Sequence, residues 1–213
     1  MPVNASLKLA GCGLYAISDG PRRDLVDACG AALAGGASLL QYRDKSADRA
    51  RRRDEATRLA QICAAHGKPL IINDDVALAA AVGAGVHLGE HDTDIAAARA
   101  TLGPDAIIGV SCYNDLERAR AAAEAGADYL AFGAFFPSQT KPQARRADAS
   151  LLVAARAFGL PLVAIGGITA DNAPQLIAAG ADFVAVVSDV FGAADIEAAA
   201  RRYLSLFPIP LAG

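Results

Sequence analysis

The sequence predicts a single α/β domain in which eight strands alternate with helices and close into a (β/α)8 barrel. Two observations lead to this fold. Short apolar runs alternate with longer alanine- and arginine-rich stretches, and one short glycine-containing motif recurs where helices would meet strands. The 213 residues, 54% hydrophobic and 20% charged, supply enough apolar material for one large core. We find no internal linker, so we expect one domain over residues 1–213, with loose ends at 1–10 and 207–213.

The strands are predicted where apolar residues occur in short continuous runs. Between these runs, stretches such as Ala47–Ala65 and Asn114–Gly126 carry apolar residues at three- and four-residue spacing, as helices that cover a sheet do. Strand and helix therefore alternate from end to end. In chain order, the expected strands are Gly13–Ser18, Ser38–Tyr42, Pro69–Ile72, Gly85–Leu88, Ala106–Val110, Asp128–Phe132, Pro161–Ile165 and Asp182–Val187.

The glycine-containing motif recurs at the expected turns between a helix and the next strand. Glycine adopts the left-handed cap conformation after a helix at little cost, which lets the chain turn directly into a strand. Eight such units in this length fit a closed TIM barrel better than an open doubly wound sheet, which usually has fewer strands and longer crossovers. The turns are Ala34–Ala37, Val82–Gly85, Glu124–Asp128 and Ala178–Asp182.

In barrels of this kind the chemistry lies at the carboxyl ends of the strands, so the residues after each apolar run are the candidates. The second run closes with the segment Gln41–Lys45. Side chains two residues apart share one face of an extended backbone, so Gln41, Arg43 and Lys45 should point the same way. An amide and two cations suit a diphosphate. A solvated strand edge is the alternative interpretation.

Two carboxylates, Asp74 and Asp92, follow the third and fourth runs and should be neighbours on this rim. Carboxylates on rigid strand ends suit Mg²⁺, which keeps waters and takes further ligands from substrate phosphates. Helix capping is the alternative, because Asp75 and Asp92 both precede helical stretches. With Arg43 and Lys45 beside them, a Mg²⁺-diphosphate site is the better explanation, since metal and cations together neutralise a highly charged leaving group.

A second phosphate site is predicted after the last two strands. The segment Gly166–Thr169 precedes a helix and Ser188 follows the eighth run, which matches the phosphate cradle of many barrels. A tight turn would also explain the two glycines. The long segment Pro137–Asp148 lacks apolar periodicity and carries hydroxyls and a lysine, which favours a loop that closes on substrate over a simple surface loop.

Composition argues against several other classes of protein. A net charge of -3 gives no general attraction for nucleic acid or an anionic membrane. The four cysteines are far apart, with no C-x-x-C pair, and fit reduced thiols of a cytoplasmic protein. Met1–Ala10 has no long apolar stretch, so we expect neither a signal peptide nor a membrane span.

Three motifs are set aside. His87–His91 fits the zinc pattern H-x-x-E-H, but that pattern requires a helix and Gly89 lies at a strand end. Gly11–Ala16 imitates a dinucleotide fingerprint but precedes its strand instead of following it. The basic run Arg49–Arg53 is interspersed with acidic residues and is interpreted as a solvated helix face, not as a nucleic-acid site.

These motifs resemble those of the thiamine-phosphate synthase family, transferases on a TIM barrel that join the pyrimidine and thiazole halves of thiamine. The resemblance extends from Leu14 to Ser188, and six strand ends agree in order. It implies small-molecule substrates and Mg²⁺ as cofactor, held by Asp74 and Asp92, and leaves a homo-oligomer open. It also implies catalytic groups at Arg43, Lys45 and Lys141, pyrimidine diphosphate ligands at Gln41, Tyr42, Arg43, Asp44, Lys45, Asn73, Ser111 and Lys141, and thiazole phosphate ligands at Ser138, Gln139, Thr140, Gly167, Val187 and Ser188.

The resemblance further implies a reaction in which the pyrimidine first loses diphosphate and the thiazole nitrogen then attacks the resulting cation. The residues agree, since they offer cations and a metal site but no evident nucleophile or triad. The sequence departs from the family at Ser138, Glu90 and Asp189, where threonine, glutamine and a small residue are usual. The two acidic departures would weaken anion binding unless they face away or hydrogen-bond elsewhere.

Two rival functions remain. The thiazole tautomerase resembles this family but relies on a histidine after the fifth strand, where this chain has Ser111, Cys112, Tyr113 and Asn114. A noncatalytic phosphate-binding barrel would keep the phosphate cradle, but it would have little use for a metal at a leaving group. Other phosphosugar barrels would be expected to place a catalytic acid and base where this chain has diphosphate ligands.

Overall fold

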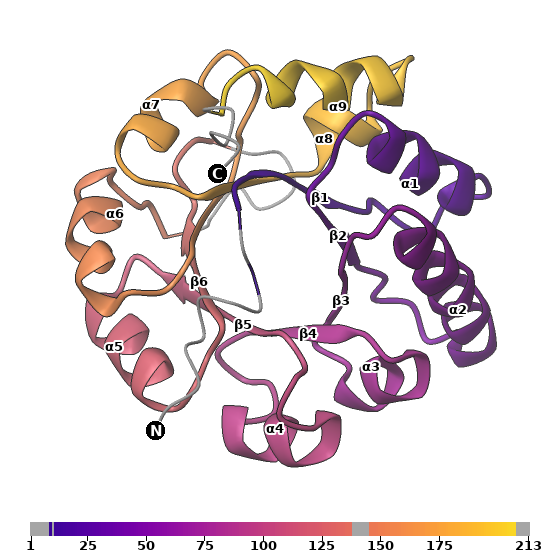
Figure 1. The fold of residues 1–213 in the computed structure, drawn as a ribbon, viewed down its shortest axis with the longest axis horizontal. Coiled ribbons are helices and arrows are strands. Elements are labelled where there is room, and N and C mark those ends of the chain that lie inside the picture. The colour runs from indigo at the N-terminus through magenta and orange to yellow at the C-terminus, as the bar shows by residue number, and fades with distance from the viewer. Residues whose placement is uncertain (1–8, 10, 138–144, 208–213) are drawn as a thin grey trace.

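In a computed structural model, which describes residues 9, 11–137 and 145–207, eight parallel strands close into a barrel in chain order, β1 to β8, with β8 paired to β1 (Figure 1). Helices form an outer ring around them, which confirms the predicted fold. The strands are β1 Gly13–Ile17, β2 Leu39–Tyr42, β3 Leu70–Asn73, β4 Gly85–Leu88, β5 Ile108–Tyr113, β6 Tyr129–Gly133, β7 Leu162–Ile165 and β8 Phe183–Val186.

The helices of the described residues follow the strands as the apolar spacing predicts, and a short extra helix follows β8. Several begin at an aspartate whose side chain accepts a backbone N–H of the first turn, as Asp48 does from Arg51 and Asp115 from Arg118. They are α1 Leu25–Ala34, α2 Arg49–Ala65, α3 Val76–Val82, α4 Ile95–Leu102, α5 Leu116–Glu124, α6 Ser150–Ala155, η2 Arg156–Phe158, α7 Ala173–Ala178, α8 Ser188–Phe191 and α9 Ile196–Leu204.

The glycine-containing motifs lie at the turns between helices and strands, as expected. Gly36, Gly83, Gly126 and Gly180 have positive φ angles of 98°, 68°, 89° and 106°, the region that glycine enters most easily. The β5 strand ends three residues later than predicted, because pairing with β6 continues through a bulge between Ser111 and Tyr113. The bulge places Ser111 and Tyr113 at the rim of the barrel.

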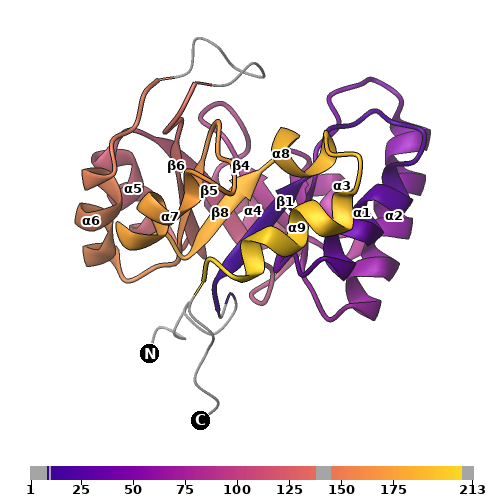
Figure 2. The ribbon, with the colours of Figure 1, turned by 90° about the horizontal axis from the view of Figure 1, so that it is seen from above.

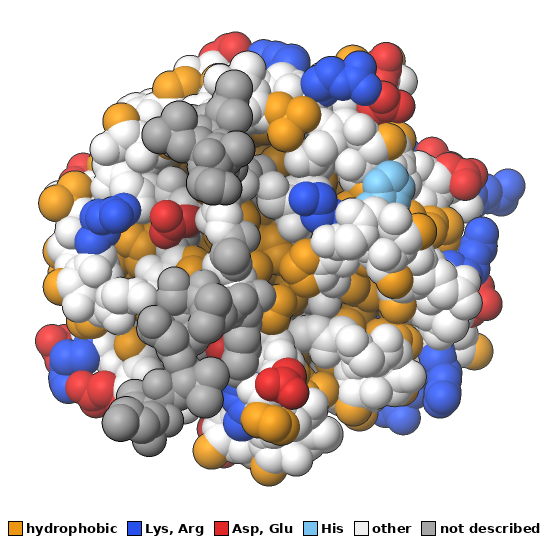
Figure 3. Space-filling view, in the orientation of Figure 1, with side chains coloured by type: hydrophobic (Ala, Val, Ile, Leu, Met, Phe, Trp, Pro, Cys, Tyr) orange, Lys and Arg blue, Asp and Glu red, His pale blue; other side chains and the backbone are white. Residues whose placement is uncertain are grey.

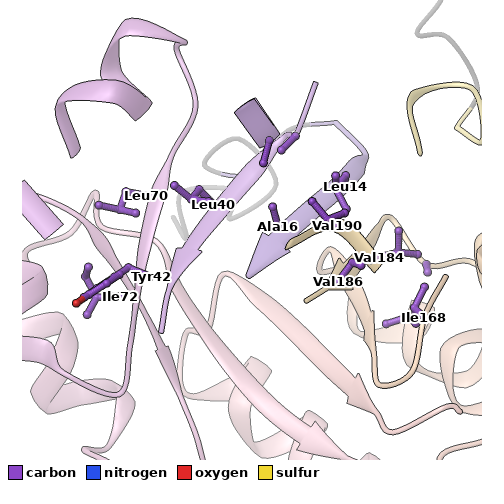
Figure 4. Close-up of a cluster of buried hydrophobic side chains, with 14 of the residues drawn as sticks. Leu14, Ala16, Leu40, Tyr42, Leu70, Ile72, Ile168, Val184, Val186 and Val190 are labelled. Carbon is purple, nitrogen blue, oxygen red and sulfur yellow. The ribbon is translucent and has the colours of Figure 1, made fainter. Parts of the chain in front are cut away.

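The strands carry two hydrophobic cores, one on each face. Outward-facing residues such as Leu14, Leu40 and Tyr42 pack under the helices, as Figure 4 shows. Inward-facing residues such as Tyr15 and Tyr129 fill the barrel itself. Burying each large side chain stabilises the fold by about 1.5–3 kcal/mol. Because both faces are buried, the strands appear in the sequence as continuous apolar runs instead of alternating ones.

The two ends of the barrel differ. In Figure 2 the described residues that directly follow β6 and precede α6 rise at the edge where the strands end, while the chain enters β1 and leaves α9 at the opposite edge. Figure 3 shows that opposite, amino-terminal end, where hydrophobic side chains gather near the centre. The polar residues that follow the strands therefore lie on the other end. No helix within the described residues is long and apolar enough to cross a membrane.

Gly109 in β5 makes room for a tyrosine inside the barrel. A Cβ at this position would lie 1.8 Å from Cζ of Tyr129, which is fully buried. We expect Gly109→Ala to lower the free energy of unfolding by about 1–3 kcal/mol or more, because the ring must move within a packed core. Chemical denaturation measures the change. The control is Gly30→Ala in α1, where no atom lies within 4 Å of the new Cβ and helix propensity predicts a gain of about 1 kcal/mol. Equal effects of the two substitutions would contradict this account.

Candidate active site

The carboxyl ends of β2, β3 and β4 bring Lys45, Asp74 and Asp92 together. Nζ of Lys45 lies 3.3 Å from Oδ2 of Asp74. Burial, and then the neighbouring carboxyl of Asp92, raises the pKa of Asp74, while Lys45 opposes the shift. Two carboxylates thus face each other beside one ammonium group, and a further cation between them would relieve their repulsion.

The backbone at Asp74 is unusual. Its φ of 64° lies in the left-handed region, which a residue other than glycine rarely occupies. The conformation is held by the backbone N–H of Asp74, which donates to the carbonyl of His87 at 2.9 Å, and by that of Asp75, which donates to the carbonyl of Asn73 at 2.8 Å. Strained residues of this kind concentrate at functional sites, where the surrounding structure maintains them.

Asp92 is fixed by the loop after β4. Its Oδ2 accepts the backbone N–H of Gly89 at 2.6 Å. A Cβ at residue 89 would lie 2.8 Å from that same oxygen, so glycine allows the close approach. The alternative role, a helix cap, belongs to Asp94, whose side chain accepts from the N–H of Ala97. Asp92 is therefore free of capping, and its carboxylate remains available at the rim.

The paired carboxylates fit a magnesium ion. Mg²⁺ is usually held by one or two carboxylates, together with waters and substrate phosphates, and not by an all-protein cage. Asp74 and Asp92 would supply these two ligands, and burial together with the neighbouring carboxyl of Asp92 raises the pKa of Asp74. The described residues hold no cluster of three or more histidine, cysteine or acidic side chains that could bind a metal. His87 lies on strand β4, not on the helix that the zinc pattern needs.

The segment Gln41–Lys45 divides its side chains between two faces. Gln41 lies inside the barrel with 3% of its surface exposed. Tyr42 instead faces α2, where its hydroxyl donates to Glu55 at 2.6 Å. Burial and this hydrogen bond raise the pKa of Tyr42 far above its usual value. The carboxylate of Asp44 pairs with Arg51 at 2.7 Å. This placement does not support a role in substrate binding for the side chains of Tyr42 and Asp44.

The interpretation of Arg49–Arg53 as a solvated face is wrong for two of its residues. Arg51 bridges Asp44 and Glu55, and Nη2 of Arg51 also donates to Oγ of Ser46 at 2.7 Å. Arg52 pairs with Asp75 at 2.9 Å and has a side chain that is only 17% exposed. These contacts anchor the strand end that carries Arg43 and Lys45, because α2 packs directly behind it.

Inside the barrel, Ser111 and Gln41 are joined by side chains to which the sequence analysis assigned no role in the site. Tyr15 and Tyr129 alternate with outward-facing apolar neighbours, a pattern equally typical of a plain core, so no specific signal distinguished them. The links are Gln41 to Tyr15 at 2.7 Å, Tyr15 to Tyr129 at 2.8 Å, Tyr129 to His87 at 2.8 Å and His87 to Ser111 at 2.8 Å.

The ends of β7 and β8 form the candidate second phosphate site. Gly166 and Gly167 have φ angles of 106° and 63°, and a Cβ on Gly167 would lie 2.3 Å from the carbonyl oxygen of Pro137. Ser188 begins α8 directly after Val187. Asp189 is turned away, because its Oδ2 accepts from the hydroxyl of Tyr203 at 2.6 Å and from the N–H of Ala170 at 3.3 Å. This departure from the family therefore has partners outside the anion site.

Glu90, the other acidic departure, has a cationic partner. It pairs with Arg145 at 3.4 Å, and its backbone N–H donates to the hydroxyl of Tyr113 at 3.3 Å. Guanidinium groups of Arg118 and Arg145 lie 5.8 and 5.3 Å from the centre of the Tyr113 ring. Four further predicted ligands, Ser138, Gln139, Thr140 and Lys141, lie outside the described residues.

Comparison with known proteins adds an independent result. The sequence model of the family described as "Thiamine monophosphate synthase" matches residues 14–190. The chain is 58% identical to a thiamine-phosphate synthase of Methylobacillus flagellatus over 198 residues, 92% of this chain and 95% of the relative. It is 63% identical to that of Azoarcus sp. over 172 residues, 80% and 84% of the two chains. A thiamine phosphate pyrophosphorylase structure from Pyrococcus furiosus superposes with a TM-score of 0.84 at 36% identity, covering 93% and 95%.

Proposed function

The chain belongs to the thiamine monophosphate synthase family, and we propose that its strand-end residues catalyse the joining of a pyrimidine diphosphate to a thiazole phosphate. Its activity is that of thiamine-phosphate synthase, a transferase. The observation that carries the proposed mechanism is the pair of carboxylates, Asp74 and Asp92, beside the cation of Lys45. This arrangement suits a leaving group that carries several negative charges.

We propose that the reaction begins with departure of diphosphate. The bond between the pyrimidine methylene carbon and the diphosphate oxygen breaks, and its electron pair leaves with the oxygen. Arg43 and Lys45 stabilise the charge that develops there, and Lys141 is proposed to assist them. Asp74 and Asp92 would hold Mg²⁺, which would supply further positive charge for the diphosphate. Gln41, Asn73 and Ser111 are proposed to orient the pyrimidine ring.

The second step requires no base. The thiazole nitrogen uses its lone pair to form a bond with the pyrimidine methylene cation, and the product is a thiazolium that has lost no proton. Three buried cysteines also offer no nucleophile that would compete with the thiazole nitrogen. The thiols of Cys29, Cys63 and Cys112 are buried, and burial raises the pKa of each, so they are not activated nucleophiles.

The thiazole phosphate is proposed to bind at the ends of β7 and β8. Gly167, which has a positive φ, is proposed to offer its backbone N–H to the phosphate, and Val187 and Ser188 lie where the chain passes from β8 into α8. Ser138, Gln139 and Thr140 complete the proposed set, with the carboxylate form of the thiazole as an alternative substrate. A cytoplasmic enzyme whose partners are small molecules fits the four free cysteines. A homo-oligomer is compatible with this proposal.

A reconstituted assay tests the proposal. Purified protein is mixed with 4-amino-2-methyl-5-hydroxymethylpyrimidine diphosphate, thiazole phosphate and Mg²⁺, and thiamine phosphate and pyrophosphate are measured. We expect the two products in equal amounts, because one diphosphate leaves for each bond formed. EDTA should abolish both, and omission of either substrate should abolish thiamine phosphate. Tight binding of thiazole phosphate without product would favour the tautomerase or a passive binder, and turnover unaffected by EDTA would refute the role of the metal.

A further inference from the structure

A chain of hydrogen bonds crosses the interior of the barrel beneath the proposed pyrimidine site. It connects two residues that are proposed to touch the substrate, and it does so through three residues that have no proposed contact with the substrate. Each hydrogen bond is 2.7 or 2.8 Å long. Tyr15 and Tyr129 are 1% and 0% exposed, so these two hydroxyls have no access to water. The chain consists of Gln41, Tyr15, Tyr129, His87 and Ser111.

The donors and acceptors of this chain can be assigned in order. Nε2 of Gln41 donates to the hydroxyl of Tyr15. A phenol has one hydrogen to donate, and the partner left for that of Tyr15 is the hydroxyl of Tyr129. Tyr129, which accepts from Tyr15, therefore donates its own hydrogen to Nδ1 of His87.

The assignment fixes the tautomer of the histidine. A neutral imidazole that accepts at Nδ1 carries its hydrogen on Nε2, so His87 donates from Nε2 to Oγ of Ser111. The hydroxyl hydrogen of Ser111 is then directed to a further acceptor. In the opposite direction, Tyr129 would donate to the hydroxyl of Tyr15, which already accepts from the Gln41 amide. The buried hydroxyl hydrogen of Tyr15 would then have no acceptor among these five residues, and an unsatisfied buried donor is costly.

Packing holds the chain in place. The rings of His87 and Tyr129 are nearly parallel, with centroids 5.6 Å apart, and Tyr15 meets Tyr129 edge-on at 6.0 Å. Gly109 leaves the space that the Tyr129 ring fills. Burial raises the pKa of Tyr15 and of Tyr129 far above the usual value, so both phenols remain O–H donors.

We propose that this chain makes the site specific for an aminopyrimidine over the corresponding oxopyrimidine, with Tyr15, Tyr129 and His87 as positioning residues. The inference rests on the proposed function. In a 4-aminopyrimidine the amino group donates and the neighbouring ring nitrogen accepts. In the 4-oxo form the carbonyl accepts and the ring N–H donates. Ser111, bound to His87, offers its hydrogen to the ring nitrogen. Gln41, held through its nitrogen by Tyr15, offers its oxygen to the amino group.

The tautomer of His87 is the first test, and it requires no turnover. The protein has three histidines, so ¹⁵N-histidine labelling and long-range ¹H–¹⁵N correlation spectra give few signals. The signal that disappears in His87→Gln is that of residue 87. We expect the hydrogen on Nε2 and a bare Nδ1 in the wild type. A hydrogen on Nδ1 would mean that the chain runs from Ser111 to Gln41, and it would overturn the proposal.

The second test measures selectivity. In Tyr129→Phe, Nδ1 of His87 loses its donor and the orientation of the Ser111 hydroxyl is no longer imposed. We expect the ratio of kcat/KM for the 4-amino over the 4-oxo pyrimidine diphosphate to fall about 10- to 100-fold. His87→Gln should retain most of the selectivity, because a carboxamide can accept from Tyr129 and donate to Ser111. An unchanged ratio in Tyr129→Phe would refute the proposal.

Tyr203→Phe is the matched control for loss of a buried tyrosine hydroxyl. Tyr203 is 0% exposed and donates to Asp189, outside the interior chain. It should lose stability without a change in the selectivity ratio. If both phenylalanine variants lost selectivity equally, general loosening would explain the effect and the proposal would fail. Absence of turnover in the wild type would instead count against the proposed function, and the histidine spectra would still decide the direction of the chain.

Discussion

Replacing Asp92 by asparagine is expected to lower kcat/KM at fixed Mg²⁺ by about 100-fold or more, and to raise the Mg²⁺ concentration that gives half-maximal rate. The substitution removes one of two negative charges from the proposed metal site, where the ion would contribute several kcal/mol of charge stabilisation. Asparagine keeps an oxygen that can accept from the N–H of Gly89, so the loop after β4 should keep its conformation. Initial rates across a Mg²⁺ titration measure both effects.

Asp94→Asn is the control for this substitution. It makes the same chemical change two residues away, at the N-cap of α4, and asparagine caps helices about as well as aspartate. Its Mg²⁺ dependence should match that of the wild type. Thiazole phosphate binding, measured by calorimetry, should survive in Asp92→Asn, because that ligand is assigned to β7 and β8. A wild-type Mg²⁺ titration curve for Asp92→Asn would refute the assignment.

The fold could be predicted because the two structural signals are local. Each strand is buried on both faces and therefore appears as an apolar run in the sequence. Each turn from a helix into the next strand needs a residue with positive φ, and that residue is a glycine. The turns contain one further feature that was missed. The carboxylates of Asp128 and Asp182 accept the first backbone N–H of β5 and β7, at Ile108 and Leu162, over 2.7 and 2.8 Å. That role depends on a neighbouring strand and has no local signature.

The candidate site could be predicted only in part. The rule that strand ends carry the chemistry brought Lys45, Asp74 and Asp92 to one rim, as the structure shows. Strand alternation places Asp44 on the opposite face from Lys45, and its link to Arg51 depends on how α2 packs. The interior chain was missed for a different reason. Whether Tyr15 meets Tyr129 depends on the closure of the barrel, since 114 residues separate them in sequence.

Lys45→Met is expected to lower kcat/KM for the pyrimidine diphosphate by about 100- to 1,000-fold, the usual loss when one group that stabilises developing charge is removed. Methionine keeps the unbranched shape and deletes only the cation. The side chain of Lys45 is 63% exposed, so its ion pair with Asp74 should contribute less than about 1 kcal/mol to stability. Kinetics with the pyrimidine diphosphate varied, together with thermal unfolding, separates the two effects.

The comparison with Lys68→Met decides whether charge at this position matters. Lys68 follows α2 and precedes β3, so it lies at the amino-terminal end of the barrel, and its substitution changes the net charge by the same amount. General electrostatic attraction of an anionic substrate would slow both variants and would weaken with salt. A local role at the leaving group slows only Lys45→Met and persists at high salt. A large loss of unfolding free energy in Lys45→Met would instead make this residue structural, because a rim cation in the proposed role contributes to the transition state and little to the fold.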